Sequence, residues 1–254
     1  MGLTCAISQP TFLPWTGWFD LVDQSDVMIL LDDVQFSKQS WQQRNRLRTR
    51  NGLEYISVPV KTAGRLAQRI IDCKLADDRF VHKTLGTLQA NYAKAAFFGE
   101  SAEELARILK FAASTASLLE LNCELISWMA GKLGITTPMV RASALAVTGR
   151  RGEHVAALCE AVGAEHYVSP PGAEAYLSED RSAFDRRGIV ISIQVYEHPE
   201  YPQCFEPFMP YASALDLIFN AGPAAGEIMR AGRKPVRPIA PSSAAVTSTR
   251  SPAG

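Results

Sequence analysis

The chain has no excess of charge and no long apolar run. Its 26 Lys and Arg residues balance 26 Asp and Glu residues, so the composition does not support a general affinity for nucleic acids or membrane surfaces. No apolar run approaches the roughly 20 residues of a membrane span, and the N-terminus lacks a basic region followed by an apolar core. We therefore expect a cytoplasmic protein without a membrane partner.

Paired cysteines, histidine motifs and glycine-rich loops are also missing. The five cysteines are odd in number and never spaced as CxxC, which indicates reduced, mostly buried thiols. None of the four histidines stands in an HxxxH or HExxH pattern, so no structural zinc site and no protein-bound metal centre of this kind is expected. There is no GxSxG motif, and the first loop, QPTFLPW, is not a glycine-rich turn. These absences disfavour an acyl-enzyme and a P-loop, but they do not exclude ATP.

Short apolar strands alternate with helical segments along the chain. Residues 27–31 form a dense apolar run closed by two aspartates, which is typical of a buried strand in a parallel sheet. Asn51-Gly52 between two extended segments indicates a β-hairpin. We predict an α/β fold with a mostly parallel sheet flanked by helices, a β-hairpin and a helical insertion at 77–133. Residues 1–222 are assigned to a single domain and residues 223–254 to a disordered tail.

Arginines recur at every second position at the start of the predicted hairpin, at Arg44, Arg46, Arg48 and Arg50. On an extended strand their guanidinium groups would share one face. One interpretation is a solvated strand face. The other is a clamp for phosphate or carboxylate, because arginine binds planar anions through two parallel hydrogen bonds.

The stretch 8–45 carries more polar and aromatic residues than folding alone requires. Gln9 ends the first predicted strand and is placed to hydrogen-bond a ligand, and Trp15 on the next loop is placed to wall a pocket, in weak analogy to adenylyl-transferring α/β proteins. Asp32 and Asp33 end the following strand, where adjacent side chains point to opposite faces. Such a carboxylate can orient or deprotonate an amine or hold Mg²⁺; the alternative is that it caps a turn.

The four histidines differ in their surroundings. His82 lies in a predicted helix, where a neutral imidazole can accept a proton from an ammonium group near neutral pH; the alternative is a packing residue. His198 follows Tyr196 in a proline-rich loop and is predicted to be a pocket wall. His154 and His166 are predicted to be surface residues.

Several motifs together point to a known family. The chain carries QPxxxPWxGWF and DDVQFxKxxWxxRNR, followed by NG and an SVPV strand, and later HKTLxxxxxNY, YVSPPGAxAYL, YEHPEYPQ and SALDLIFNAG. Over residues 4–222 this series resembles the WbqC-like family of bacteria. The resemblance implies a role in surface-polysaccharide or natural-product biosynthesis, in which an amino acid such as glycine, or another acyl group, is attached to an amino-sugar nucleotide. It also implies that Asp33 and Gln35 are site members.

The prediction is a transferase that forms an amide between an activated amino acid or acyl group and an amine acceptor such as an amino-sugar nucleotide. The alternative is a non-catalytic subunit that holds a nucleotide sugar or a carrier in a biosynthetic cluster. The donor is made with ATP and Mg²⁺, or it arrives on a carrier protein, coenzyme A or an aminoacyl-tRNA. The predicted catalytic residues are His82 and Asp33, and the predicted substrate-binding residues are Gln9, Trp15, Gln35, Arg44, Asn45, Tyr176, Tyr196 and His198.

Overall fold

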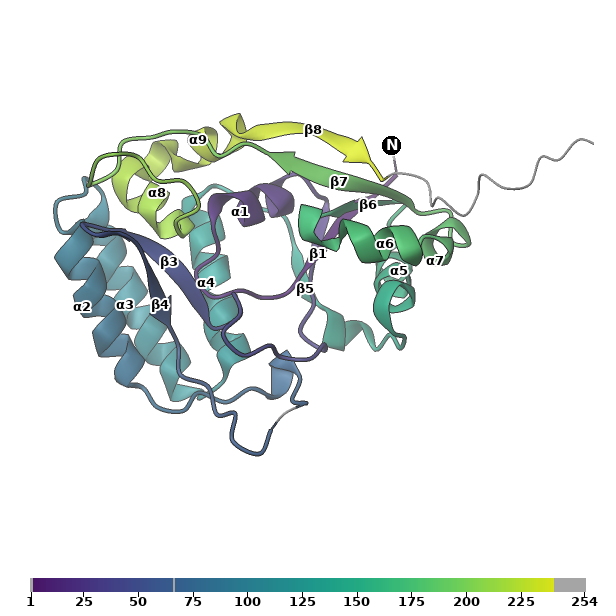
Figure 1. Cartoon of the computed structure of the whole chain (residues 1–254), viewed down its shortest axis with the longest axis horizontal. Coiled ribbons are helices and arrows are strands. Elements are labelled where there is room, and N and C mark those ends of the chain that lie inside the picture. The colour runs from purple at the N-terminus through teal and green to yellow at the C-terminus, as the bar shows by residue number, and fades with distance from the viewer. Residues whose placement is uncertain (1, 66, 240–254) are drawn as a thin grey trace, which may run out of the picture.

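A six-stranded sheet forms the centre of the computed structural model, which describes residues 2–65 and 67–239 (Figure 1). The strand order is β5-β2-β1-β6-β7-β8, and β8 alone runs antiparallel to its neighbour. The strands are β1 (Thr4–Ser8), β2 (Val27–Leu30), β5 (Met139–Arg141), β6 (His166–Ser169), β7 (Val190–Tyr196) and β8 (Arg233–Pro238). The predicted α/β fold with a mostly parallel sheet is confirmed.

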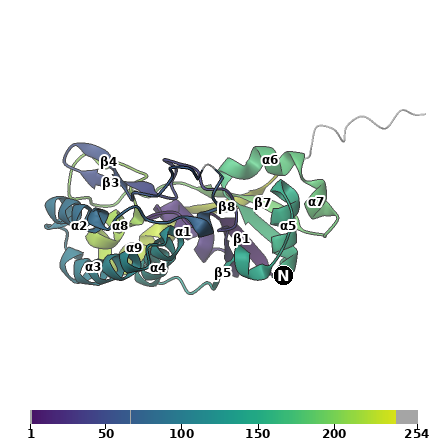
Figure 2. The same cartoon turned by 90° about the horizontal axis from the view of Figure 1, so that it is seen from below.

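Alternate residues of the central strands face two different hydrophobic cores. Cys5 and Ile7 of β1 belong to one core, and Ala6 between them belongs to the other. The helices α5 (Arg151–Ala161), α6 (Glu174–Glu179) and α7 (Ser182–Asp185) supply the first core, and α1 (Thr16–Asp23), α8 (Ala214–Ala221) and α9 (Ala225–Ala231) contribute to the second. Figure 2 shows α5, α6 and α7 on one side of the strands and α8 and α9 on the other. Helices therefore cover both faces of the sheet.

Between β2 and β5 the chain forms a second unit beside the sheet (Figure 1). It consists of the antiparallel hairpin β3 (Arg44–Thr49) and β4 (Gly52–Ser57) and of the helices α2 (Arg79–Tyr92), α3 (Phe98–Ser114) and α4 (Leu118–Lys132). The predicted hairpin is confirmed, with its turn next to Gly52, whose φ of 111° suits glycine. Tyr92 and Phe98 each place their rings 5.2 Å from the ring of Phe219 in α8, which joins this unit to the rest of the core.

The order of the strands reverses at β1. The chain leaves β1 through α1 and reaches β2 on one side, whereas α5 leads to β6 on the other side of β1. Loops that leave the carboxyl ends of β1 and β6 therefore diverge. In doubly wound sheets this divergence leaves a crevice in which ligands bind.

Ordered structure continues beyond residue 222, so the prediction of a disordered tail starting at residue 223 is wrong. Helix α9 buries Met229 completely, and β8 pairs with β7. Arg233 at the start of β8 donates from Nε to Oδ1 of the fully buried Asp20 (2.7 Å) and from Nη2 to Asp23 (2.5 Å). This ion pair connects the last strand to α1. The remainder of the predicted tail, residues 240–254, lies outside the described residues.

Three features concern membranes, metals and thiols. In the part of the chain that the structure describes, no helix is both long and apolar enough to cross a membrane. Within the same residues, no group of three or more His, Cys, Asp and Glu side chains is arranged to hold a metal ion. All five cysteines are free, and Cys5, Cys73 and Cys159 are buried, as predicted.

Candidate functional site

A pocket of about 640 Å³ opens at the point where the strand order reverses. Ser8 and Gln9 at the end of β1 contribute to its lining, as do Pro170, Gly172 and Tyr176 from the segment after β6. The hairpin unit and the loop before α8 close it from the opposite side; they contribute Trp41, Asn45, Arg46 and Tyr211. The pocket therefore lies where the fold alone predicts a ligand site.

Aromatic rings and uncharged polar groups dominate the pocket walls. The aromatic members are Trp15, Trp18, Trp41, Tyr167, Tyr176 and Tyr211. Arg46 is the one charged side chain among the described residues that line the pocket. Its Nε is buried without a hydrogen-bond partner among the described groups, and its Nη2 donates to the carbonyl oxygen of Tyr211 at 3.4 Å. The pocket thus offers stacking surfaces and one cation with unused donor capacity.

Side-chain amides hold the loop after β1 in place. Asn45 donates from Nδ2 to the carbonyl oxygens of Phe12 (3.0 Å) and Leu13 (2.8 Å), so both protons of this amide are engaged within the protein. Gln42 donates from Nε2 to Oε1 of Gln9 at 2.8 Å. The NH₂ group of Gln9 has no bond to another described group, and Gln9 lines the pocket. Gln9 is therefore placed to bind a ligand, whereas Asn45 shapes the wall.

Trp15 lies over the first turn of α1, and Gly17 makes this position possible. A Cβ at residue 17 would lie 2.3 Å from the Trp15 ring.

We expect Gly17→Ala to displace the ring and to lower the free energy of unfolding by roughly 1–3 kcal/mol. Chemical denaturation checks this value. Gly86→Ala is the matched control, because a Cβ on that helical residue meets nothing within 4 Å and is expected to stabilise the protein slightly. Equal stability of wild type and Gly17→Ala would contradict the packing.

Tyr196 and His198 contact the ring of Trp15 and do not line the pocket. The Trp15 ring stands edge-on to Tyr196 at 5.6 Å and stacks on His198 at 6.2 Å. Burial raises the pKa of Tyr196 to about 12, and its hydroxyl donates to the carbonyl oxygen of Met229 at 3.1 Å. Burial also lowers the pKa of His198, so its ring favours the neutral state. Both residues support the pocket wall through Trp15.

The two aspartates after β2 have separate partners. Asp32 is fully buried and accepts hydrogen bonds from the backbone N–H (2.9 Å) and the hydroxyl (2.7 Å) of Ser143. Asp33 places Oδ2 3.0 Å from Nε2 of His154. The prediction that His154 is a surface residue is wrong, because it is only 8% exposed. The two residues are 121 positions apart in the chain, so no local sequence pattern predicts their contact.

Residues close in sequence to Asp33 and His154 line the pocket. Leu31 and Val155, which line the pocket, are two residues before Asp33 and one residue after His154. Asp33 Oδ1 and His154 Nδ1 are both buried, and neither has a partner among the described groups. Buried polar atoms without partners are rare in folded proteins, and a catalytic role is one of the explanations for such atoms.

Three other predicted site residues lie away from this pocket. His82 is exposed on α2, in a separate shallow depression that Asp78 and Lys110 also line. Gln35 lies in the loop after β2, and its backbone pairs with that of Arg69 as an isolated antiparallel β-bridge. Arg44 lies on β3 with its guanidinium 4.4 Å above the ring of Tyr55. The structure brings Gln9, Trp15, Asn45 and Tyr176 together in the pocket, and the roles assigned to His82, Gln35 and Arg44 stay predictions.

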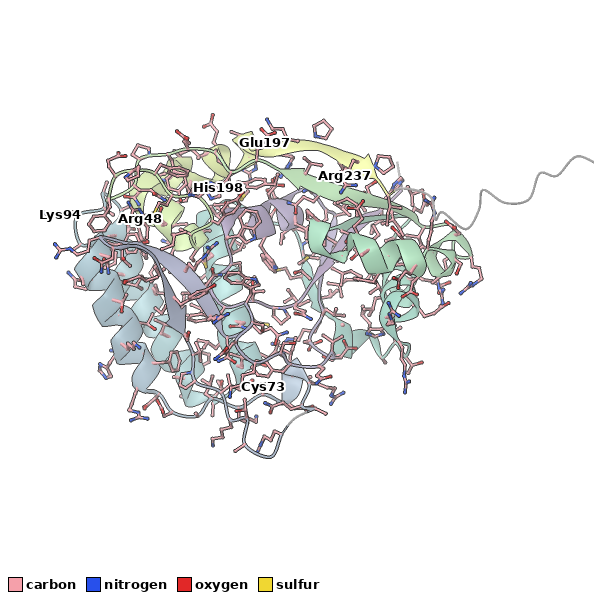
Figure 3. The ribbon with its side chains drawn as sticks, viewed as in Figure 1. Arg48, Cys73, Lys94, Glu197, His198 and Arg237 are labelled. Carbon is pink, nitrogen blue, oxygen red and sulfur yellow. The ribbon has the colours of Figure 1, made fainter. Side chains whose placement is uncertain are left out.

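The alternating arginines of β3 have different environments. Arg46 reaches the pocket, and Arg50 lies exposed just beyond the strand. Arg48 is buried, and its Nη2 donates to the carbonyl oxygens of Phe205 (3.0 Å) and Pro207 (2.9 Å). Arg48 therefore fixes the loop between β7 and α8, on the side of the molecule where Figure 3 also places His198.

The fold and the pocket define the class: a doubly wound α/β protein with a pocket at its switch point. Residues 9–228 match the WbqC-like protein family, and the chain belongs to that family. It is similar to the uncharacterized protein Rv1507c of Mycobacterium tuberculosis (strain ATCC 25618 / H37Rv), with 35% identity over 226 residues, 89% of this chain and 96% of that protein. No solved structure matches the chain. The family resemblance predicted from the motifs is confirmed.

Proposed function

We propose that the protein binds an amino-sugar nucleotide in the switch-point pocket and transfers an activated amino acid or acyl group to its amine. The observation that carries the proposal is the composition of the pocket. Six aromatic rings and the unpaired Nε of Arg46 suit a ligand that combines a planar ring with phosphate charge. The absence of Asp and Glu from the described lining leaves this cation uncompensated for an anionic ligand.

Amide formation from an activated donor does not require the protein to form a covalent intermediate. The neutral amine of the acceptor attacks the carbonyl carbon of the donor and forms a C–N bond. The bond from that carbon to the leaving group breaks, the nitrogen loses a proton, and the leaving group takes one. The protein must position the two partners and provide a base.

Asp33 and His154 are our candidates for that base. The described residues that line the pocket include no Asp, Glu, His or Lys, so the lining itself offers no proton acceptor of this kind. Nε2 of His154 lies 3.0 Å from Oδ2 of Asp33, and in our proposal Nδ1 acts as the basic nitrogen while Nε2 faces the carboxylate. That nitrogen is buried without a described partner. It can take the proton that the amine loses, while Asp33 stabilises the resulting imidazolium.

Removing the pocket cation tests the binding half of the proposal. We expect Arg46→Ala to weaken binding of a nucleoside-diphosphate amino sugar by about 1.5–3 kcal/mol, which is roughly 10- to 150-fold in Kd. Isothermal titration calorimetry over a panel of such sugars measures the change. Arg50→Ala is the matched control, because it removes the same charge from the same hairpin outside the pocket. Equal affinities of the Arg46 variant and the wild type would exclude the pocket as the anion site.

A turnover experiment tests the chemical half. The purified protein is incubated with an amino-sugar nucleotide and a panel of donors: glycine with ATP and Mg²⁺, acyl-coenzyme A, an acylated carrier protein and aminoacyl-tRNA. Mass spectrometry then looks for the acylated sugar nucleotide. Product from at least one donor is the expected result.

The lack of a base in the lining favours a second candidate, a non-catalytic subunit that holds a nucleotide sugar for a partner enzyme. This candidate predicts tight binding of the sugar nucleotide with no product from any donor. That outcome would overturn the transferase.

A further inference from the structure

Two arginines and two aromatic rings from the hairpin and the segment before it form a ladder of successive contacts. The guanidinium carbon of Arg44 lies 4.4 Å from the ring centroid of Tyr55, and that of Arg46 lies 5.6 Å from the ring centroid of Trp41. The two rings are 6.1 Å apart, and they are 47% (Trp41) and 54% (Tyr55) exposed. We call these four residues the hairpin ladder. The two neighbouring rings make one contiguous exposed patch, and contiguous patches of this kind mark interaction sites.

The hairpin ladder carries charge that no described carboxylate neutralises. Among the residues that the structure describes, no Asp or Glu forms an ion pair with Arg44 or Arg46. The surrounding segment, residues 34–76, holds nine Lys and Arg but only two Asp and Glu, a net charge of +7 in a chain whose total is zero. A local positive field of this kind attracts a polyanion even though the whole protein is neutral.

The hairpin ladder continues into the switch-point pocket. Trp41 and Arg46 belong to both, and Arg46 donates from Nη2 to the carbonyl oxygen of the half-exposed Tyr211, which also lines the pocket. A ligand stretched along the ladder therefore delivers its end to the pocket. Arg44 and Tyr55 belong to the ladder alone, which allows the two surfaces to be tested separately.

The chemistry of the ladder matches single-stranded nucleic acid. Exposed rings stack on unpaired bases, and guanidinium groups contact the phosphates between them. A duplex hides its base faces, and an acidic protein has no planar groups to stack on the two rings. A bilayer surface would need an apolar face rather than rings covered by arginine.

We propose that the hairpin ladder binds the single-stranded end of an RNA and directs its terminal ribose into the pocket. An acyl group carried as an ester on that ribose is then the donor, and this donor role rests on the proposed function. The acceptor amine attacks the ester carbonyl, a C–N bond forms, the C–O bond breaks, and the ribose oxygen leaves with a proton. Binding of the RNA itself does not depend on the transfer.

The test is fluorescence anisotropy with a labelled single-stranded RNA of about 12 nucleotides and with the same strand in a duplex. We expect the single strand to bind more tightly than the duplex. Tyr55→Ala is expected to weaken binding of the single strand roughly 5- to 150-fold, because one stacking platform is lost. Arg44→Ala is expected to weaken binding and to reduce the slope of log Kd against log salt concentration by about 0.7, the value for one phosphate contact to a single strand.

A matched pair of controls lies on α3. Arg107 and Phe111 are an exposed arginine and an aromatic residue that is 62% exposed, and both line a shallow depression outside the ladder. Arg107→Ala and Phe111→Ala are expected to bind the RNA as the wild type does. Equal binding of duplex and single strand, or unchanged binding by both ladder variants, would overturn the proposal. Capture of an acidic carrier protein that requires Arg44 and Tyr55, with no RNA binding, would also overturn it.

Failure of the RNA-binding proposal can be distinguished from failure of the proposed sugar-nucleotide site. Arg44→Ala and Tyr55→Ala are expected to keep the wild-type affinity for a nucleoside-diphosphate amino sugar, because neither residue lines the pocket. If the sugar nucleotide binds and the RNA does not, only the ladder proposal is wrong. If the RNA binds through the ladder and no sugar nucleotide binds, the acceptor site is wrong. Melting temperatures of all variants confirm that they are folded.

Discussion

A chain ended at Gly222 is expected to lose its cooperative thermal unfolding transition. The shortened protein lacks α9, which contributes the fully buried Met229, and it lacks β8, which covers the edge of β7. It also leaves Asp20 buried without the guanidinium group of Arg233. Near-ultraviolet circular dichroism and calorimetry of the shortened chain measure the loss. A chain ended after Ile239, the last described residue, is the control and is expected to melt as the full chain does.

A single substitution measures how much the ion pair between Arg233 and Asp20 contributes to this loss of stability. Arg233→Ala is expected to cost about 3–5 kcal/mol of unfolding free energy at pH 7, because it leaves the buried carboxylate of Asp20 without its counter-charge. Asp20 is fully buried and also accepts hydrogen bonds from Gln194 (2.9 Å) and Gln24 (3.0 Å). These amides keep the carboxyl group hydrogen-bonded in the variant but do not neutralise its charge.

The pH dependence of this loss gives a second signature. Burial raises the pKa of Asp20 above its ordinary value, and the neighbouring Arg233 opposes that rise. In the Arg233 variant the pKa of Asp20 therefore rises further, and folding favours the protonated carboxyl group. The loss of stability is smallest near the ordinary pKa of aspartate, where the group can be neutral, and grows as the pH rises towards 7.

Arg237→Ala is the matched control on the same strand. Arg237 pairs with Glu174 at the exposed surface, so its removal is expected to leave the unfolding free energy nearly unchanged. A loss for Arg233→Ala that is equally large at all pH values would contradict the role assigned to Asp20. Unfolding of the chain ended at Gly222 at the temperature of the full chain would show that α9 and β8 contribute nothing.

The misread tail shows which information a sequence pattern lacks. RKPVRP has a composition typical of a disordered segment, with two prolines and three cations and no apolar alternation. It becomes a strand because the free edge of β7 offers hydrogen-bond partners and Asp20, more than 200 residues earlier, offers a counter-charge. Both causes are contacts between residues far apart in the sequence, so a short stretch of sequence cannot reveal them.

The pocket shows the opposite case. Gln9, Trp15 and Tyr176 follow strand ends, and in a doubly wound sheet the carboxyl ends of the strands meet at one edge. Sequence reasoning could therefore place them at one site without knowing any contact. It could not separate Trp15, which lines the pocket, from Tyr196 and His198, which support it from behind, because that difference depends on how the loop after β7 packs.

Loss of the Asp33–His154 pair is expected to lower turnover about 10²- to 10⁴-fold, the usual effect of removing a general base. Asp33 was assigned to the site from the family resemblance, whereas its contact with His154 depends on the fold, which brings the N-terminal part of α5 to the end of β2. His154→Gln removes the basic nitrogen and keeps a hydrogen-bond donor for Asp33. Asp33→Asn keeps the shape and removes the charge that stabilises the imidazolium.

Three variants and two readouts decide which histidine is the base. With the donor that gives product, His154→Gln and Asp33→Asn are expected to lower kcat while calorimetry finds unchanged affinity for the sugar nucleotide, because neither residue supplies the rings or the cation that hold it. His82→Gln is expected to keep the wild-type kcat, because His82 is exposed on α2 in a different depression. The reverse result, with kcat lost in His82→Gln and kept in His154→Gln, would move the base to α2 and require the acceptor to bind there. Loss of kcat in Asp33→Asn together with a kept rate in His154→Gln would assign the proton to the carboxylate itself, whose Oδ1 is buried and has no described partner.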